Sequence, residues 1–419
     1  MLDTKEAGRA SVLSKRWYVV WSSISVLDFR PQYFTEFWDI IYNYDDDSVQ
    51  RFVGIIDKTM QRYLVQKYRI RKMYLMVPKV DEKVATLVDK WIMIAVQNQI
   101  QKLEIWVRGE IKYWLPEILF SAKSLKYLKC LRIGLPYYET MELISLEYLS
   151  LEPSDVDDNM LQRIISSCPL VELDITCNFL DNILLPWMRK VDGIEGCNSG
   201  TMQSYIACPL QKFVYTGLGL EDSWPWNMNV VALKNLRKLE ICWASISDDV
   251  VSELASGLIA LESLVLESCL RLKCIKISSI SLKEFRIGDD LNVKNNEFPN
   301  EDGLDLMKIT IDTPNLLDFS YNCKVETSLS LIRMPDHCNA HFFPLVEDAI
   351  NTVWFVKLKK FLTETNLFKS LAMDLCFSDQ TVIEEDQLNN VVTGPPYQLR
   401  ELKLLETRPW DSTKSSLVA

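Results

Sequence analysis

A leucine pattern that recurs along most of the chain constrains its fold more than any other feature. The pattern is an apolar residue, two mostly polar residues, an apolar residue, a polar residue and a last apolar residue. The clearest copies are Leu146–Leu151, Leu170–Ile175, Leu236–Ile241, Leu261–Leu266 and Leu282–Ile287. Weaker copies start at Ile70, Ile100, Leu128, Leu210, Leu306, Leu316, Phe368 and Leu399. The chain is therefore expected to be a repeat array.

The spacing of these copies gives the pattern its specificity. Hydrophobic residues make up 48% of the 419 residues, so three apolar positions coincide by chance in roughly one window in nine. The first positions, however, advance by 24 residues from 146 to 170, and by 26, 25 and 21 residues along 210, 236, 261 and 282. These steps agree with the repeat length of about 20–29 residues that leucine-rich repeats have.

The pattern also fits the physical needs of a strand and its return. The last three positions alternate between apolar and polar residues, as a short half-buried strand requires. A helical return follows two of the copies, one with Asp158 as cap and Pro169 as stop, the other with Ser247 as cap. Such units bury their apolar faces only by stacking. We therefore predict an α/β fold, a curved leucine-rich-repeat solenoid over residues 31–410.

Two long intervals interrupt the regular spacing. From 170 to 210 the step is 40 residues, and from 316 to 368 it is 52 residues. We predict loop excursions near 181–207 and 322–367, the second with a helix over about 353–368, and a disordered tail at 411–419. Excursions of this kind either carry binding or are neutral insertions, and the sequence leaves both open.

Charge and cysteine content restrict the classes of partner and compartment. A net charge of −11 disfavours a broad surface for nucleic acid or for an anionic membrane. The 11 cysteines form no C-x-x-C pair, which indicates free thiols in a reducing compartment. With neither a secretory signal nor a membrane-spanning run visible, we expect a cytoplasmic or nuclear protein.

The sequence carries no convincing catalytic or metal-binding motif. The two histidines, His337 and His341, have the spacing of helical metal ligands, but Pro335 and Pro344 bracket a segment too short for a sound helix. Surface or loop histidines are the better interpretation. We expect no enzyme activity, no cofactor and no metal site.

A dense basic and aromatic segment precedes the repeats. It reads TKEAGRASVLSKRWYVVWSSISVLDF over residues 4–29 and closely resembles the second half of a plant F-box. Later segments, SSCPLVELDI and GPPYQLRELKL, resemble repeats of the same family, the plant F-box/FBD/LRR-like proteins. The matching positions are Thr4, Lys5, Glu6, Ala7, Arg9, Ser11, Leu13, Ser14, Lys15, Arg16, Trp17, Trp21, Leu27, Asp28 and Phe29.

The resemblance implies a function for this segment. In the family, two helices, here 5–13 and 14–21, help to form the surface that docks on a Skp-type adaptor, which in turn binds a cullin. The alternative is that the two tryptophans pack the segment against the first repeats. The residues that the resemblance assigns to adaptor binding are Leu13, Lys15, Arg16, Trp17 and Trp21.

The chain also departs from the family pattern at both ends. We expect the first F-box helix with its Leu-Pro entry and the terminal FBD-type segment to be missing from the sequence as given. Either the chain is a truncated product or Met1 is not its natural start. We therefore expect residues 1–30 to be a partial F-box, with weakened adaptor binding because central apolar anchors of the interface are lost.

The leading hypothesis is a substrate-recognition subunit of a Skp-cullin-F-box ubiquitin ligase. Its unknown target protein is expected on the concave strand face, where Glu240 and Arg286 stand between buried strand residues. The alternative is a non-catalytic scaffold or decoy that has lost productive adaptor binding.

Overall fold

The chain forms two compact units of stacked strands. Unit 1 comprises Met1–Tyr215 and Trp226–Asn235, and unit 2 comprises Thr216–Pro225 and Leu236–Ala419. The computed structural model describes residues 24–31, 46–109, 111–139, 141–152, 158–176, 209–217, 233–288, 308–323, 327–343, 352–365, 370–374 and 401–405.

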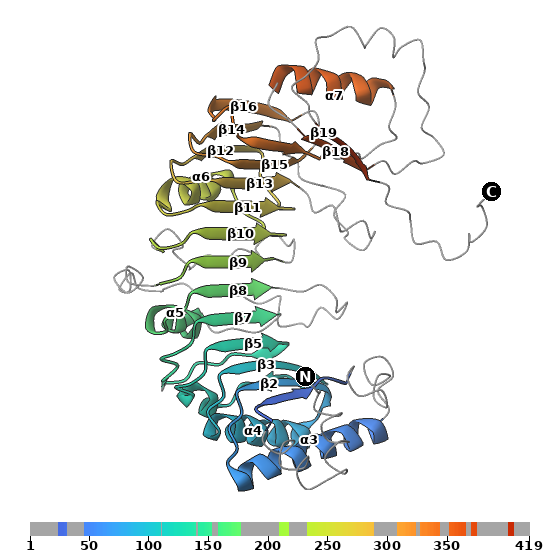
Figure 1. The fold of residues 1–419 in the computed structure, drawn as a ribbon, viewed down its shortest axis with the longest axis vertical. Helices are drawn as coiled ribbons and strands as arrows, with labels where there is room; N and C mark the ends of the chain where they lie inside the picture. Colours follow the sequence, from blue (N-terminus) through green and yellow to red (C-terminus); the bar gives the residue numbers. More distant parts are fainter. Residues whose placement is uncertain are drawn as a thin grey trace, which may run out of the picture. The chain divides into compact units, whose positions relative to one another are not determined.

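Unit 1 is built on one sheet of short strands that lie side by side (Figure 1). Every pairing from β1 to β8 is parallel, with one residue opposite one along most of each strand. A small parallel pair, β4 (Tyr113–Trp114) with β6 (Ile133–Gly134), lies next to the 3-10 helix η3 (Glu117–Ser121) in sequence. In spatial order the main strands are β1 (Val26–Phe29), β2 (Lys72–Val80), β3 (Lys102–Gly109), β5 (Tyr127–Leu131), β7 (Tyr148–Glu152), β8 (Glu172–Thr176) and β9 (Lys212–Thr216).

Two long helices cover the start of this sheet, and the repeat pattern did not predict them. Helix α3 (Asp46–Gln66) precedes β2, and α4 (Glu82–Gln97) connects β2 to β3. They pack on each other and on β2. Asp57 ties them together, because its Oδ1 accepts bonds from Lys90 Nζ at 3.1 Å and from the buried Trp91 indole at 3.0 Å. The first two returns are thus longer and more helical than the later ones.

Unit 2 contains strands of two parallel sheets. The helix α6 (Asp248–Gly257) lies between β10 and β11 in sequence, and α7 (Thr352–Thr365) between β17 and β18. The smaller sheet consists of β12 (Cys274–Ser278), β14 (Lys308–Asp312) and β16 (Ser328–Arg333). The larger one contains β10 (Lys238–Cys242), β11 (Ser263–Glu267), β13 (Glu284–Gly288), β15 (Asp318–Asn322), β17 (Asn339–Phe342), β18 (Ser370–Asp374) and β19 (Glu401–Leu405).

The five clear copies of the leucine pattern fall on β7, β8, β10, β11 and β13, so the predicted leucine-rich-repeat solenoid is confirmed. Two weaker assignments were wrong. The copy placed at Leu128 starts at Leu125, because Leu128 pairs with the second apolar position, Leu103, of the preceding strand. The copy placed at Leu306 forms β14, which belongs to the smaller sheet and not to the main series.

Aromatic side chains stack through the core of unit 2. Phe285 on β13 lies 5.8 Å from Phe319 on β15, measured between ring centroids, and Phe319 lies 6.0 Å from Tyr321 on the same strand. Tyr321 stacks on Phe361 of α7 at 5.6 Å, and Phe342 contacts the same ring at 4.8 Å. Helix α7 is therefore attached to the repeats through Phe361.

One predicted helix cap and one of the two predicted excursions fall largely within the described residues. Ser247 caps α6 by accepting a bond from the Val250 amide, as predicted. The predicted excursion at 322–367 contains β16, β17 and α7, the last of which coincides with the helix expected there. Residues 181–207 and the tail 411–419 lie outside the described residues, so those predictions remain predictions.

The described cysteines are free thiols, as predicted. Most are buried, and Cys274 is exposed; burial raises the pKa of Cys168 to about 12. No helix within the described ranges is long and apolar enough to cross a membrane. The buried cysteines thus act as small apolar core residues: Cys130, Cys168, Cys269, Cys323 and Cys338.

Substitution by alanine is expected to change stability in opposite directions at two glycines. Gly288 at the end of β13 has φ +139°, and a Cβ there would overlap the backbone carbonyl of Asn322. Gly288→Ala is expected to lower the free energy of unfolding by about 1–3 kcal/mol. Gly54 in α3 has open space where a Cβ would lie, so Gly54→Ala should raise the free energy of unfolding by about 0.5–1 kcal/mol. Urea unfolding of both variants tests this, and equal effects would contradict the described backbone.

Candidate functional site

The solvent face of the unit 1 sheet carries an ordered set of side chains. Side chains alternate between the two faces of a strand, so every second residue points away from the core. Parallel pairing without offset then places equivalent outward residues side by side. We call the central set the polar row; across β1, β2, β3, β5, β7 and β8 it consists of Asp28, Tyr74, Glu104, Lys129, Ser150 and Asp174.

A second set, the apolar row, lies two residues further along three of these strands. Met76, Trp106 and Leu131 pair in register and are all half-exposed. Together with the polar row they line a pocket with a volume of about 260 Å³ on the solvent side of the sheet. We call this the β2–β5 pocket; its lining residues are Arg30, Tyr74, Leu75, Met76, Glu104, Ile105, Trp106, Lys129 and Leu131.

Cations and aromatic rings alternate on the same face. The Arg30 guanidinium lies 4.5 Å from the centroid of the Tyr74 ring, and Lys102 Nζ lies 3.8 Å from that of Tyr127. Tyr127 in turn stacks on Tyr148 at 4.1 Å with the rings nearly parallel. Burial, and then the neighbouring Tyr148, raise the pKa of Tyr127 above its usual range. These contacts hold the aromatic side chains in fixed orientations.

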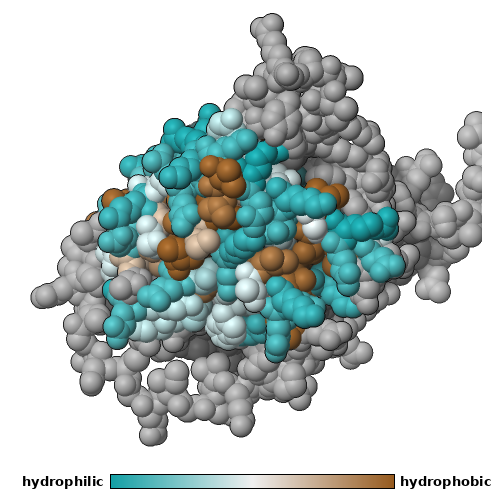
Figure 2. All heavy atoms as spheres, turned by 90° about the horizontal axis from the view of Figure 1, so that it is seen from below, coloured by the Kyte–Doolittle hydropathy of each residue, from teal (hydrophilic) through white to brown (hydrophobic). Residues whose placement is uncertain are grey.

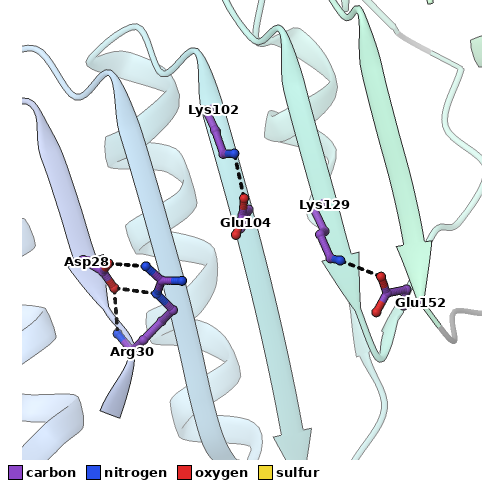
Figure 3. A network of polar contacts seen from close by, with 6 residues as sticks. All are labelled: Asp28, Arg30, Lys102, Glu104, Lys129 and Glu152. Atoms are coloured by element: carbon purple, nitrogen blue, oxygen red, sulfur yellow. Dashed lines mark hydrogen bonds and ion pairs between the residues drawn. The ribbon is translucent and has the colours of Figure 1, made fainter. Parts of the chain in front are cut away.

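Ion pairs hold the charged side chains around the pocket (Figure 3). Arg30 binds Asp28 through its Nε at 2.9 Å, and Lys102 binds Glu104 at 2.8 Å. Lys129 Nζ lies 2.6 Å from Glu152 Oε1. Burial is the largest single influence on Lys129 and lowers its pKa, but the bond to Glu152 and the nearby charges, that of Glu152 first, together outweigh burial, so the pKa of the ammonium group is raised.

The far end of the polar row holds a half-buried acid. The two oxygens of Asp174 accept bonds from Thr176 Oγ1 at 3.0 Å and from Ser150 Oγ at 3.3 Å. These bonds favour the charged carboxylate, yet burial raises the pKa of Asp174, and the nearby charge of Glu152 adds to the effect. The nearby charge of Lys129 lowers the pKa of Asp174, but it offsets this increase only in part. An ionised group that costs free energy in the folded state is typical of a binding or catalytic position.

The two predicted substrate-binding residues lie on the solvent face of unit 2. Glu240 on β10 and Arg286 on β13 occupy the same row, with Val265 of β11 between them. Glu240 Oε1 pairs with Lys238 at 2.8 Å, and Arg286 Nη1 lies 3.3 Å from Glu267. They therefore lie in register two strands apart, and their role in substrate binding stays a prediction.

The strand entries of unit 2 form a separate charged cluster. Glu262 accepts bonds from Arg237 at 2.7 Å and from Lys283 at 3.0 Å, one from each neighbouring repeat. The bond from Lys283 is the largest cause that holds the pKa of Glu262 below its usual range. This cluster links three successive repeats at the entry ends of their strands and is largely exposed.

The remaining candidate residues divide into two groups. Leu13, Lys15, Arg16, Trp17 and Trp21 lie outside the described residues. His337 is exposed in a turn and His341 is half-buried on β17, so the two do not share a helix. Within the described ranges, the acidic residues, cysteines and histidines form no group of three or more that could hold a metal ion.

The sequence reasoning missed the β2–β5 pocket, although a signal for it was present. Met76 and Trp106 each follow the first position of a weak repeat copy, Ile70 or Ile100, by six residues. Leu131 has the same offset from Leu125. Because that copy was placed three residues too late, the three apolar side chains did not align.

Repeated short parallel strands with buried leucines beneath a mixed polar and aromatic face define a leucine-rich-repeat protein. Sequence comparison agrees, because residues 64–218 and 225–353 match the family described as At1g61320/AtMIF1, LRR domain. This match covers more than half of the chain, so the chain belongs to this leucine-rich-repeat domain family.

Three relatives from Arabidopsis thaliana illustrate the similarity. FBD-associated F-box protein At5g44490 is 30% identical over 189 residues, which are 43% of this chain and 37% of the relative. F-box/LRR-repeat protein 13 is 27% identical over 46% of this chain and 44% of its own length. F-box/FBD/LRR-repeat protein At1g78750 is 27% identical over 45% of this chain and 41% of its own length. Each match thus covers less than half of the relative.

Asp174 gives a prediction about pH. Its folded-state pKa is raised, so its contribution to stability is present at acid pH and is lost as the pH rises through that pKa. Asp174→Asn is therefore expected to stabilise the fold at pH 7, by at most about 1 kcal/mol because the carboxylate is partly screened. The gain should vanish near pH 3 in urea unfolding. Glu172→Gln on the same strand is the control, and a loss of stability at pH 7 would contradict the prediction.

Proposed function

We propose that the chain is a substrate-recognition subunit of a Skp-cullin-F-box ubiquitin ligase. The observation that carries this proposal is the joint occurrence of a segment that resembles part of an F-box, residues 4–21, and a leucine-rich-repeat domain of the At1g61320/AtMIF1 type. The names of two Arabidopsis relatives, F-box/LRR-repeat protein 13 and F-box/FBD/LRR-repeat protein At1g78750, pair the same two elements. The proposed partners are a Skp-type adaptor, the cullin bound to it, and a target protein.

In this proposal the chain performs no chemistry. It holds the target near the ubiquitin-charged enzyme, so that transfer becomes effectively intramolecular. The repeats are suited to this, because their solvent face is continuous across neighbouring strands and is fixed by ion pairs and stacked rings. The compartment proposed is the cytoplasm, the nucleus or both.

Adaptor binding by the amino-terminal segment is the part of the proposal that can be tested first. The chain is titrated calorimetrically against a Skp-type adaptor, alone and with Trp17→Ala and Trp21→Ala combined. We expect a dissociation constant at or below about 1 μM, weakened at least about tenfold by the double substitution. Large aromatic residues dominate such interfaces, so their removal should have this effect.

A matched control is available within unit 1. Trp114 on β4 is 45% exposed, so Trp114→Ala removes the same kind of side chain at a distance in sequence from the F-box-like segment. This variant should bind the adaptor like the unchanged chain. A folded chain that does not bind the adaptor would overturn the ligase proposal and leave a repeat scaffold or decoy.

A further inference from the structure

The β2–β5 pocket is an apolar site on a face that is otherwise polar. Met76, Trp106 and Leu131 pair in register on three adjacent strands, and all three side chains are half-exposed. Figure 2, which shows the molecule from below, has hydrophobic side chains in separate patches among hydrophilic ones. The three side chains of the apolar row are instead aligned in register and line one pocket, so a single partner can cover them together.

The size and lining of the pocket favour a single large side chain as its occupant. Its volume of about 260 Å³ lies just below the range of about 300–1,000 Å³ that small-molecule sites have. Its walls are Trp106, Tyr74 and the aliphatic part of Arg30, and tryptophan, tyrosine and arginine are the residues that dominate the energetics of protein interfaces. An anchor residue of a peptide segment fits these features better than a free ligand does.

The charge at the other end of the polar row indicates what should accompany the anchor. On β5, β7 and β8, the carboxylates of Glu152 and Asp174 lie near the ammonium group of Lys129, which forms an ion pair with Glu152. Glu172, on the same face of β8, adds a further carboxylate. A cation brought next to Asp174 would offset the cost of its burial, whereas an anion would increase it.

The distance between the two sites sets the spacing in the partner. From Trp106 on β3 to Asp174 on β8 there are three strand steps, by way of β5 and β7. At about 4.8 Å a step this is roughly 14 Å across the strands, and the offset of two residues between the two rows adds about 7 Å along them, so the separation is about 16 Å. An extended peptide advances about 3.3 Å per residue and covers this distance in about four or five residues.

We propose that this face binds a partner segment that inserts a large apolar side chain into the β2–β5 pocket and places a lysine or arginine about four or five residues away, beside Asp174 and Glu152. This inference rests on the proposed function and deepens it, because it names the chemical class of the target. The net charge of −11 agrees with a basic partner and not with nucleic acid.

A display experiment with short random peptides tests the proposal. The full chain is immobilised, bound peptides are sequenced, and selected peptides are resynthesised and titrated. We expect enrichment of Trp, Phe, Leu or Met with Lys or Arg about four or five positions away. Trp106→Ala should weaken these peptides at least about tenfold. Asp174→Asn should remove the preference for a basic residue and leave the apolar preference intact.

Two further variants make the result decisive. Trp106→Phe keeps an aromatic side chain and should retain most of the binding, which separates loss of contact from loss of fold. Trp114→Ala, which removes a 45% exposed tryptophan on β4 outside the pocket, should change nothing. Enrichment of acidic peptides, or binding that is insensitive to both Trp106→Ala and Asp174→Asn, would overturn the inference. Adaptor affinity is measured on the same variants, so a failure of the ligase proposal is recognised independently.

Discussion

The stacking of equivalent apolar side chains from one strand to the next is the interaction on which the rest of the structure depends. In unit 1, Leu103, Leu128, Leu149 and Leu173 occupy paired positions on successive strands and are almost completely buried. No repeat can bury these side chains alone, so each strand is stable only beside its neighbours. The same pairing aligns the outward positions, and the rows on the solvent face are its direct result.

The repeat core was predictable because its signal is local. The L-x-x-L-x-L pattern marks the buried positions of each strand without knowledge of the neighbours, and the spacing of the clear copies fixed the fold class. The prediction was wrong at Leu128, because the pattern can start there or three residues earlier with equally apolar positions. It was also wrong at β14, because this strand belongs to another sheet. Helices α3 and α4 were missed because the leucine pattern describes strands, although Phe52, Ile56, Met60 and Tyr63 follow a helical period.

The candidate site was less predictable, because it depends on which outward residues become neighbours. Glu240 and Arg286 were chosen from the alternation within single strands, and both do lie on the solvent face. To predict the pocket around Trp106, one must know the register of three strands at once. To predict the raised pKa of Asp174, one must know how deeply it is buried and where Glu152 lies, and the spacing of residues along the chain gives neither.

The smaller sheet of unit 2 carries its own protection against aggregation. Helix α6 packs on β12 at one edge, and Asp248 accepts bonds from the amides of Lys273 and Cys274 at 2.9 Å each. At the other edge, β16 is the last strand of the sheet, and its Ile332 is 58% exposed. A register shift at Ile311/Asp312 and the Arg333–Asp312 ion pair interrupt this edge. Bulges and charges of this kind disfavour pairing with a foreign strand, so the outer edge of this small sheet is a poor template for its extension.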